Sequence, residues 1–201
     1  MPGARDLTDL GVDVSRETLL TLEAYQAEVL RWNARINLVS RSTVPVIWER
    51  HIRDSAQIWP LAPETAEHWL DLGSGAGFPG LVIAILARDL RPGMTVSLIE
   101  SDLRKSVFLQ SVARELDLTV TVYPERIEQV QPLGADVISA RALSPLPRLL
   151  SLANRHAGPA CTYLLPKGQD YHSELEGLSA PQPRIIPSAT HPDSVILCFE
   201  K

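Results

Sequence analysis

The sequence predicts an α/β fold in which a small helical cap precedes a doubly wound, mostly parallel sheet. From Trp69 onward, apolar runs of strand length alternate with stretches of helical periodicity, as in parallel strands joined by covering helices. A glycine-dense turn at residues 73–80 lies between the first of these strands and the next helix. Residues 184–188 and 194–200 predict two further strands around a short polar turn, which form an antiparallel pair at the end of the sheet.

The cap is predicted to hold two helices after a loose lead-in over residues 1–14. Ser15 is expected to cap the first helix, whose apolar stripe ends near Ala34. The second helix is predicted over residues 43–59, because the proline at position 60 ends it.

Strands and helices then alternate along the rest of the chain. Strands are predicted at residues 69–72, 95–100, 119–123, 136–140 and 161–165, and helices at 79–88, 103–116, 125–131 and 146–155. An antiparallel pair that closes a parallel sheet is typical of the Rossmann-like class I methyltransferase fold, and a plain dinucleotide-binding domain lacks it. With 201 residues, the cap (1–65) and the sheet domain (66–201) are expected to form one compact unit.

Composition narrows the class of protein. No basic-then-apolar leader opens the chain, and its longest apolar run is far below the ~20 residues that span a bilayer, so we expect a soluble, cytoplasmic protein without membrane contact. As a separate expectation, the protein is a monomer. The net charge of −5 argues against a protein that coats nucleic acid nonspecifically. Cys161 and Cys198 lie in apolar, strand-like segments and are expected to be buried and reduced, with no metal site.

The glycine-dense turn carries the strongest functional signal. It follows the apolar strand that ends around Asp71, and it places Gly73, Gly75 and Gly77 before a new helix. Glycines let the backbone approach a ligand closely, and the start of the helix offers unpaired N–H groups and a positive dipole end. Glu100 ends the next predicted strand at a spacing that suits an acid binding both ribose hydroxyls. These residues indicate a cofactor that contains adenosine.

The glycines fit two patterns that predict different cofactors. Residues 75–80 match G-x-G-x-x-G, the fingerprint of dinucleotide-binding domains, which is weak on its own. Counted from Asp71, the pattern is D-x-G-x-G-x-G, which is typical of enzymes that use S-adenosyl-L-methionine (SAM) and in which the acid faces the amino acid portion of the ligand. We favour SAM, because no segment on either side is long enough to form the substrate region of an NAD enzyme.

Short segments outside the glycine turn form a more specific set. Two asparagine segments, Trp32-Asn33 and Ile36-Asn37-Leu38, and the trio His51-x-x-Asp54-Ser55 precede the turn. After it come Glu100-Ser101, Arg104-Lys105, Phe108-Leu109, Arg126-Ile127-Glu128, Ser139-Ala140-Arg141-Ala142 and Pro166-Lys167-Gly168. Together with the turn, these segments resemble the RsmG (GidB) family of bacterial 16S ribosomal RNA guanine-N7 methyltransferases over nearly the whole chain.

The resemblance implies the activity and the cofactor site. The expected reaction is methylation of N7 of a specific guanosine in the 530 loop of 16S ribosomal RNA, with SAM as donor and S-adenosyl-L-homocysteine as product. The partner would be this RNA or the small ribosomal subunit. Gly73 and Phe78 would then line the SAM pocket, and Ile127 and Glu128 would border the adenine. Arg141 would reach the cofactor or the transfer site.

Three polar residues are the candidates for catalysis. Guanine N7 has a free in-plane lone pair, so its methylation needs no general base, and catalysis would come mainly from orientation and exclusion of water. Asp54 is expected to stabilise the cationic product ring or to accept hydrogen bonds from the guanine N1–H and amino group. Arg141 and Lys167, at the ends of the fourth and fifth predicted strands, would contact phosphate or base. The alternative for both is an ordinary exposed cation.

The densest basic segment, residues 31–53, is the candidate RNA-facing surface. The alternative for this segment is a solvated helix face. His51 could equally be a packed histidine between helices. Asn33 and Asn37 could have a purely structural role, in which they cap the end of the first helix and tie the cap to the sheet domain. The four tryptophans are expected in the core. The residues predicted to contact RNA are Arg31, Arg35, Arg41, His51, Arg53, Arg104 and Lys105.

Two other classes of function share the cofactor residues. A methyltransferase that acts on a small molecule or a protein would differ only in what its cap and cleft accept. A non-catalytic nucleotide-binding module would keep the glycine turn but would transfer no methyl group.

Overall fold

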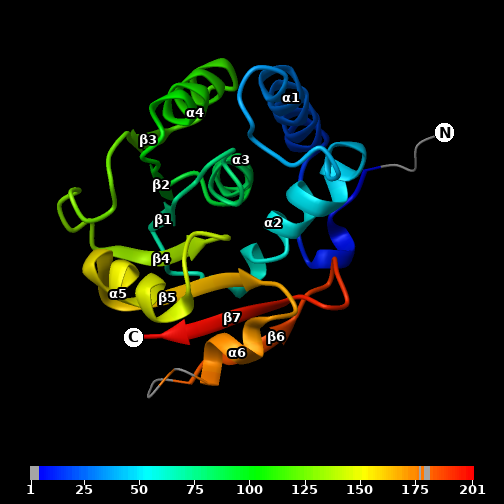
Figure 1. Ribbon diagram of the computed structural model, residues 1–201. Coiled ribbons are helices and arrows are strands. Elements are labelled where there is room, and N and C mark those ends of the chain that lie inside the picture. The colour runs from blue at the N-terminus through cyan, green and yellow to red at the C-terminus, as the bar shows by residue number, and fades with distance from the viewer. Residues whose placement is uncertain (1–4, 177, 179–181) are drawn as a thin grey trace.

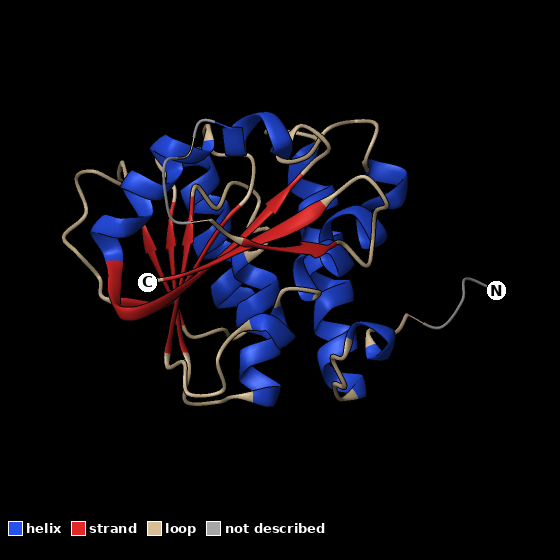
Figure 2. Ribbon diagram, turned by 90° about the horizontal axis from the view of Figure 1, so that it is seen from below, coloured by secondary structure: helices blue, strands red, loops and turns tan. Residues whose placement is uncertain are grey.

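A single sheet with helices on both faces organises the molecule (Figures 1 and 2). The computed structural model describes residues 5–176, 178 and 182–201. The strands are β1 (His68–Leu72), β2 (Thr95–Ile99), β3 (Val120–Tyr123), β4 (Ala135–Ala140), β5 (Ala157–Lys167), β6 (Arg184–Pro187) and β7 (Val195–Glu200). Their spatial order is β3-β2-β1-β4-β5-β7-β6. β1 to β5 are parallel and β7 is antiparallel to both its neighbours, which confirms the predicted class I methyltransferase sheet.

The helices divide between the two faces of the sheet. Figure 1 shows α1, α3 and α4 on one side, with α5 and α6 on the other. Their bounds are α1 (Arg16–Asn33), α3 (Gly80–Leu90), α4 (Leu103–Glu115), α5 (Leu146–His156) and α6 (Tyr171–Glu176). The first eight residues of α3, from Gly80 to Ala87, are all buried. This helix is apolar on every side because it packs on the sheet and is itself covered by α1.

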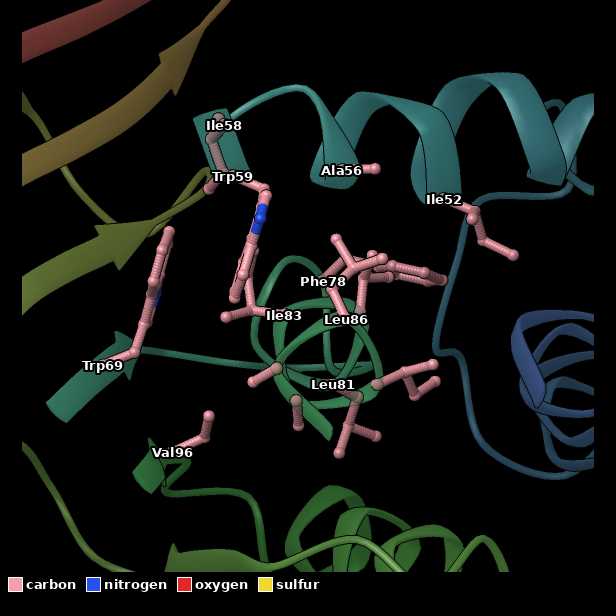
Figure 3. Close-up of a cluster of buried hydrophobic side chains, with 14 of the residues drawn as sticks. Ile52, Ala56, Ile58, Trp59, Trp69, Phe78, Leu81, Ile83, Leu86 and Val96 are labelled. Carbon is pink, nitrogen blue, oxygen red and sulfur yellow. The ribbon is translucent and has the colours of Figure 1, made fainter. Parts of the chain in front are cut away.

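The cap shares one hydrophobic core with the sheet domain (Figure 3). Trp59, from the cap, stacks on Trp69 of β1 with ring centroids 6.3 Å apart. Trp48, Trp59 and Trp69 are buried, and Trp32 packs edge-on against Phe108 of α4, so the expectation that the tryptophans belong to the core is confirmed. The sequence boundary near residue 65 therefore separates segments that are packed together.

Both ends of α1 agree with the sequence. The Ser15 hydroxyl accepts a hydrogen bond from Thr18 N–H, which confirms the predicted N-cap. At the other end, Asn33 Oδ1 accepts from Leu38 N–H at 2.8 Å and from Val39 N–H at 3.0 Å. Asn33 thus stabilises the loop that leaves the helix, which is the structural role considered for it.

The prediction of a loose lead-in is wrong for the part of it that the structure describes. Thr8–Leu10 forms a 3₁₀ turn, and Leu7, Leu10 and Val12 are buried in the core. Their spacing fits neither a helix nor a strand, so periodicity alone gave no signal for them.

The second cap helix is broken rather than continuous over residues 43–59. The segment consists of a 3₁₀ turn (Val44–Val46), a π-helical turn (Trp48–Arg53), α2 (Asp54–Ala56) and another 3₁₀ turn (Trp59–Leu61). Proline lies in the first turn of both 3₁₀ pieces, where its missing N–H costs no helical hydrogen bond. The π-helical turn carries His51 and leads into the turn that carries Asp54, so the irregularity falls on predicted site residues.

Three differences concern the sheet domain. Residues 125–131 form a turn and not a helix, because the carbonyls of Ile127 and Val130 accept hydrogen bonds from side chains of α5. The short helix α6 was not predicted. β5 begins at Ala157 rather than residue 161, with a register shift against β4.

The two cysteines lie in the core, as predicted. Cys161 on β5 and Cys198 on β7 are both buried and free. Burial raises the pKa of the Cys161 thiol to about 12. Within the described residues, no helix combines the length and hydropathy needed to cross a bilayer.

Candidate active site

Two adjoining cavities open where the carboxyl ends of the central strands meet. The first, of about 390 Å³, lies beside the glycine turn and Glu100. The second, of about 570 Å³, lies between the cap and the C-terminal strands and is lined by Asp54, Arg141 and Lys167, among others. Residues 142–144 line both cavities and form the wall between them. The strand order reverses between β1 and β4, and ligands of doubly wound sheets bind at such a switch point.

Bare backbone forms the floor of the first cavity. Gly73 and Gly75 line it with left-handed backbone angles, φ +65° and +57°. A Cβ atom on Gly73 would lie 2.5 Å from Leu143 Cδ1 in the wall, so the Leu143 side chain would have to move to admit any side chain there. The N–H groups of Gly73 and Ser74 both donate to the carbonyl of Ile99 on β2, which holds the turn across the two strands. The turn therefore needs glycine both for its conformation and for space.

Gly77 and Phe78 support the turn from the side of the cap. A Cβ atom on Gly77 would lie 2.8 Å from the hydroxyl of Tyr25, which donates a hydrogen bond to Ala76 O at 2.6 Å. Phe78 is buried and packs on Tyr25, with ring centroids 5.2 Å apart. Neither Gly77 nor Phe78 is among the described residues that line the first cavity. Their predicted contact with the cofactor stays a prediction, and their observed role is to fix the turn.

The two predicted acids have different surroundings. Asp71 is buried beneath the turn, where its carboxylate accepts hydrogen bonds from Ser139 Oγ at 2.7 Å and Gly80 N–H at 3.3 Å. Burial raises the pKa of Asp71 to about 6. Asp71 joins the turn to β4 and is not among the described residues that line the first cavity, so its predicted contact with the cofactor stays a prediction. Glu100 does line the first cavity, and it accepts hydrogen bonds from the N–H groups of Gly75 and Asp102.

The far end of the first cavity is held in place by α5. Ile127 and Glu128 line the cavity on the turn after β3. The carbonyl of Ile127 accepts from His156 Nε2 at 3.0 Å, and Glu128 forms an ion pair with Arg148 at 3.5 Å. The sequence predicts these two residues at the adenine, and the structure brings them to the same cavity as Gly73 and Glu100.

Asp54 and Arg141 meet in the second cavity, although 87 residues separate them. Arg141 Nη1 lies 3.3 Å from Asp54 Oδ2, and Arg141 Nη2 lies 2.9 Å from His51 Nδ1. The other carboxylate oxygen of Asp54 accepts hydrogen bonds from Thr190 Oγ1 and Gln57 Nε2, both at 2.9 Å. The carboxylate is thus fixed from the cap, from β4 and from the loop between β6 and β7.

Lys167 also lies in the second cavity with an acidic partner. Its Nζ is 2.7 Å from Glu174 Oε2 on α6, and only 10% of its side chain is exposed. The same oxygen accepts from the N–H of Leu146, the first residue of α5. Glu174 therefore stabilises both the lysine and a helix N-terminus.

The fold is similar to those of solved methyltransferases. A SAM-dependent methyltransferase from Aquifex aeolicus superimposes with a TM-score of 0.60 at 15% identity, and the match covers 86% of this chain and 97% of the other. TYW2 of M. jannaschii, solved in complex with AdoMet, superimposes with a TM-score of 0.56 at 12% identity over 83% and 77% of the two chains.

Closer relatives are found by sequence. The ribosomal RNA small subunit methyltransferase G of Cereibacter sphaeroides is 50% identical over 189 residues, which cover 92% of this chain and 91% of the relative. Its namesake from a Jannaschia species is 49% identical over 92% and 90%. The family model GidB, described as rRNA small subunit methyltransferase G, matches residues 18–183. The chain belongs to the GidB family. The resemblance stated from the sequence is therefore confirmed.

The structure divides the basic residues of this GidB-family chain into two groups. Arg31 is paired with Glu28 and Glu115, and Arg53 is paired with Asp9 and Glu49. Arg104 similarly pairs with the N-cap residue of α4. Arg35, Arg41 and Arg50 are exposed and have no acidic partner among the described residues, and Lys105 is half-buried at the first cavity.

Several residues of the site carried no local signal. Gln57 is buried and bonds to Asp54 as well as to Ser188, Ala189 and Thr190, so it joins the cap to the β6–β7 loop. Leu143 forms the wall between the cavities. Only the tertiary structure places these residues, since the contacts of Gln57 with residues 188–190 and of Leu143 with Gly73 join segments that are distant in sequence.

Proposed function

We propose that this chain transfers the methyl group of SAM to N7 of a guanosine in the 530 loop of 16S ribosomal RNA. The observation that carries the proposal is the wall of residues 142–144, with a glycine-floored cavity on one side and the cavity of Asp54 and Arg141 on the other. Cofactor and base would meet across this wall. Membership of the GidB family and the class I fold identify SAM as the cofactor.

The residues of the first cavity fit an adenosyl cofactor. The backbone at Gly73 and Gly75 leaves room that a side chain would fill, and Glu100 offers a carboxylate for ribose hydroxyls. Ile127 supplies an apolar contact for the adenine at the far end of the cavity, with Glu128 beside it. When bound, SAM supplies an electrophilic methyl group.

The second cavity suits a single unstacked nucleotide. Guanine N7 faces the major groove, which is too deep and narrow in A-form RNA for protein side chains to reach. The target guanosine therefore has to leave its stack before it can approach the wall. A cavity of about 570 Å³ lies within the usual size range of sites for small ligands.

The charged residues of this cavity orient the base rather than remove a proton. N7 attacks with its own lone pair, and the Asp54 carboxylate is held by Arg141, Thr190 and Gln57. From this fixed position, it would accept hydrogen bonds from the guanine Watson–Crick edge or offset the positive charge that develops on the ring. Arg141 and Lys167 would contact the flanking phosphates, and the cap would exclude water.

The decisive experiment supplies radiolabelled SAM and compares three substrates: small ribosomal subunits, free 16S ribosomal RNA, and total small-molecule and protein extract. Chemical cleavage at N7-methylguanosine then maps the label. We expect label in the RNA at one guanosine of the 530 loop, and no transfer by the Arg141→Ala variant. Label at another atom or in another RNA would contradict the proposed position. Label only in proteins or small molecules would contradict an RNA methyltransferase altogether.

A further inference from the structure

His51 lies at the centre of the contacts that hold Arg141. It belongs to the π-helical turn Trp48–Arg53, and its ring stacks on Phe78 with centroids 4.9 Å apart and planes 20° apart. Arg141 Cζ also lies over the Phe78 ring, 5.3 Å from its centroid. The buried Phe78 therefore contacts both the imidazole and the guanidinium. Because it follows Gly77 directly, it joins the glycine turn to two residues of the second cavity.

The hydrogen bonds of His51 fix its tautomer. Arginine has only donors, so His51 Nδ1 must be the acceptor of the 2.9 Å contact with Arg141 Nη2. The proton of the neutral ring is then on Nε2, which lies 2.9 Å from Thr43 Oγ1 and donates to it. Both ring nitrogens are therefore occupied.

The contact with His51 is the shortest that Arg141 makes in the described part of the chain. The other two, to Asp54 Oδ2 and to the carbonyl of Arg50, measure 3.3 and 3.4 Å. Long contacts of this kind are weak, so they leave the direction of the guanidinium poorly defined without the imidazole.

From these contacts we infer that His51 is a positioning residue, a neutral hydrogen-bond acceptor that orients the guanidinium of Arg141 in the second cavity, beside Asp54. The inference rests on the proposed function, since it assigns a purpose to the orientation of Arg141. It removes His51 from the residues expected to contact RNA, and it excludes His51 as an acid or base in the reaction.

The electrostatic surroundings agree with a neutral ring. Burial, together with the positive charges of Arg141 and Arg50, lowers the pKa of His51 to about 3. Asp54, the nearby carboxylate, is directed to Arg141 and not to the imidazole. The ring therefore keeps its acceptor nitrogen throughout the physiological pH range.

Three substitutions of His51 distinguish the role of its acceptor nitrogen from the role of its ring, which stacks on Phe78. His51→Asn keeps an acceptor oxygen at the place of Nδ1, His51→Gln keeps polar atoms only near the place of Nε2, and His51→Phe keeps only the stack on Phe78. Loss of a hydrogen bond to a charged group predicts that kcat on small subunits falls about 10- to 100-fold for the Gln and Phe variants. His51→Asn should recover most of that loss. His68→Asn is the matched control, because His68 lies at the opposite end of β1 and bonds to Ser97.

A spectroscopic measurement tests the inference without any substrate. In ¹⁵N-labelled protein, the ring signal lost in His51→Asn should have the Nε2–H pattern and should not titrate between pH 5 and 8. An Nδ1–H pattern, titration near pH 6.5, or equal kcat for the Phe and Asn variants would overturn the inference. If wild-type protein methylates no ribosomal RNA, the proposed function fails, but the ring signal still decides how His51 is bonded.

Discussion

The two cavities differ in how the chain constructs them. The first combines the backbone of the glycine turn, at Gly73 and Gly75, with side chains that follow β2, β3 and β4 and with side chains of α5. The second gathers side chains from the broken cap helix, the ends of β4 and β5, α6 and the β6–β7 loop. Backbone chemistry is therefore concentrated where a cofactor shared by many enzymes would bind. Side-chain chemistry is concentrated where the substrate would be selected.

The same difference extends to charge. In the second cavity, the Asp54–Arg141 and Lys167–Glu174 pairs join two of the lining cations to acids, and further hydrogen bonds fix both pairs. In the first cavity, Glu100 accepts backbone N–H groups. Substitutions should therefore affect cofactor affinity in one cavity and turnover on RNA in the other.

Gly73→Ala should have the largest effect, and this effect should be on the affinity for the cofactor. A Cβ atom there meets Leu143 Cδ1 at 2.5 Å and forces a left-handed φ on a residue that resists it. The strain predicts that the Kd for S-adenosyl-L-homocysteine, measured by calorimetry, rises about 100-fold or more. Gly93→Ala is the control, since a Cβ atom on Gly93 would have no neighbour within 4 Å. Unchanged affinity of the Gly73 variant would refute the proposed cofactor floor.

Asp54→Asn should have the opposite signature. It keeps the shape of the side chain and removes the charge opposite Arg141, so kcat on small subunits should fall about 10- to 100-fold. The Kd for S-adenosyl-L-homocysteine should stay within about twofold, because Asp54 lines only the second cavity. Asp13→Asn, on an exposed residue outside both cavities, is the matched control. Single-turnover methylation at the wild-type rate would show that the Asp54 charge has no role.

Charge reversal should distinguish the arginines that have no acidic partner among the described residues from those that are paired. Arg50→Glu, at the rim of the second cavity, should weaken binding to small subunits and reduce the slope of log K against log salt by about 1. Arg31→Glu should change binding less, because Glu28 and Glu115 already neutralise Arg31. Filter binding over a salt series measures both. Equal losses for the two variants would contradict the division of the basic segment.

The pH dependence of stability should show the smallest effect. The His51 pKa is lowered from 6.5 to about 3, so below pH 6.5 the unfolded chain takes up a proton that the folded chain refuses. The contribution of His51 to the free energy of unfolding therefore declines as pH falls from 6.5 toward 3. Asp71 opposes this between pH 6 and 3.8, because its pKa is raised to about 6 and the folded state there binds the extra proton.

Denaturant unfolding at pH 7, 6 and 5 isolates the part due to His51. The difference in free energy of unfolding between wild type and His51→Asn should shift against the wild type as the pH falls. A difference that stays constant over this range would contradict a lowered pKa for His51.

The fold and part of the first cavity could be predicted from the sequence because their signals are local: Gly73, Gly75 and Glu100 line this cavity, whereas Asp71, Gly77 and Phe78 are not among its described lining residues. Strand alternation, the glycine spacing and the acid at Glu100 each depend on a few neighbouring residues. The predictions that were wrong concern segments whose structure depends on distant residues. The lead-in around Leu7 and the turn around Ile127 take their shape from distant partners, namely the core and the side chains of α5.

The second cavity shows the same limit at the level of single residues. Asp54, Arg141 and Lys167 were predicted by family resemblance and do line one cavity. Thr190 was not predicted, because it lies 136 residues from Asp54, and Gln57 was not predicted although it lies only three residues from Asp54, because no functional motif includes it. The same holds for the acceptor role of His51, which depends on an arginine 90 residues away.

A crystal structure with bound S-adenosyl-L-homocysteine tests the central claim most directly. The ligand should occupy the cavity floored by Gly73, with its ribose at Glu100, its adenine beside Ile127 and its sulfur toward residues 142–144. A ligand seated instead among Asp54, Arg141 and Lys167, or a first cavity that remains empty at saturating ligand, would contradict it.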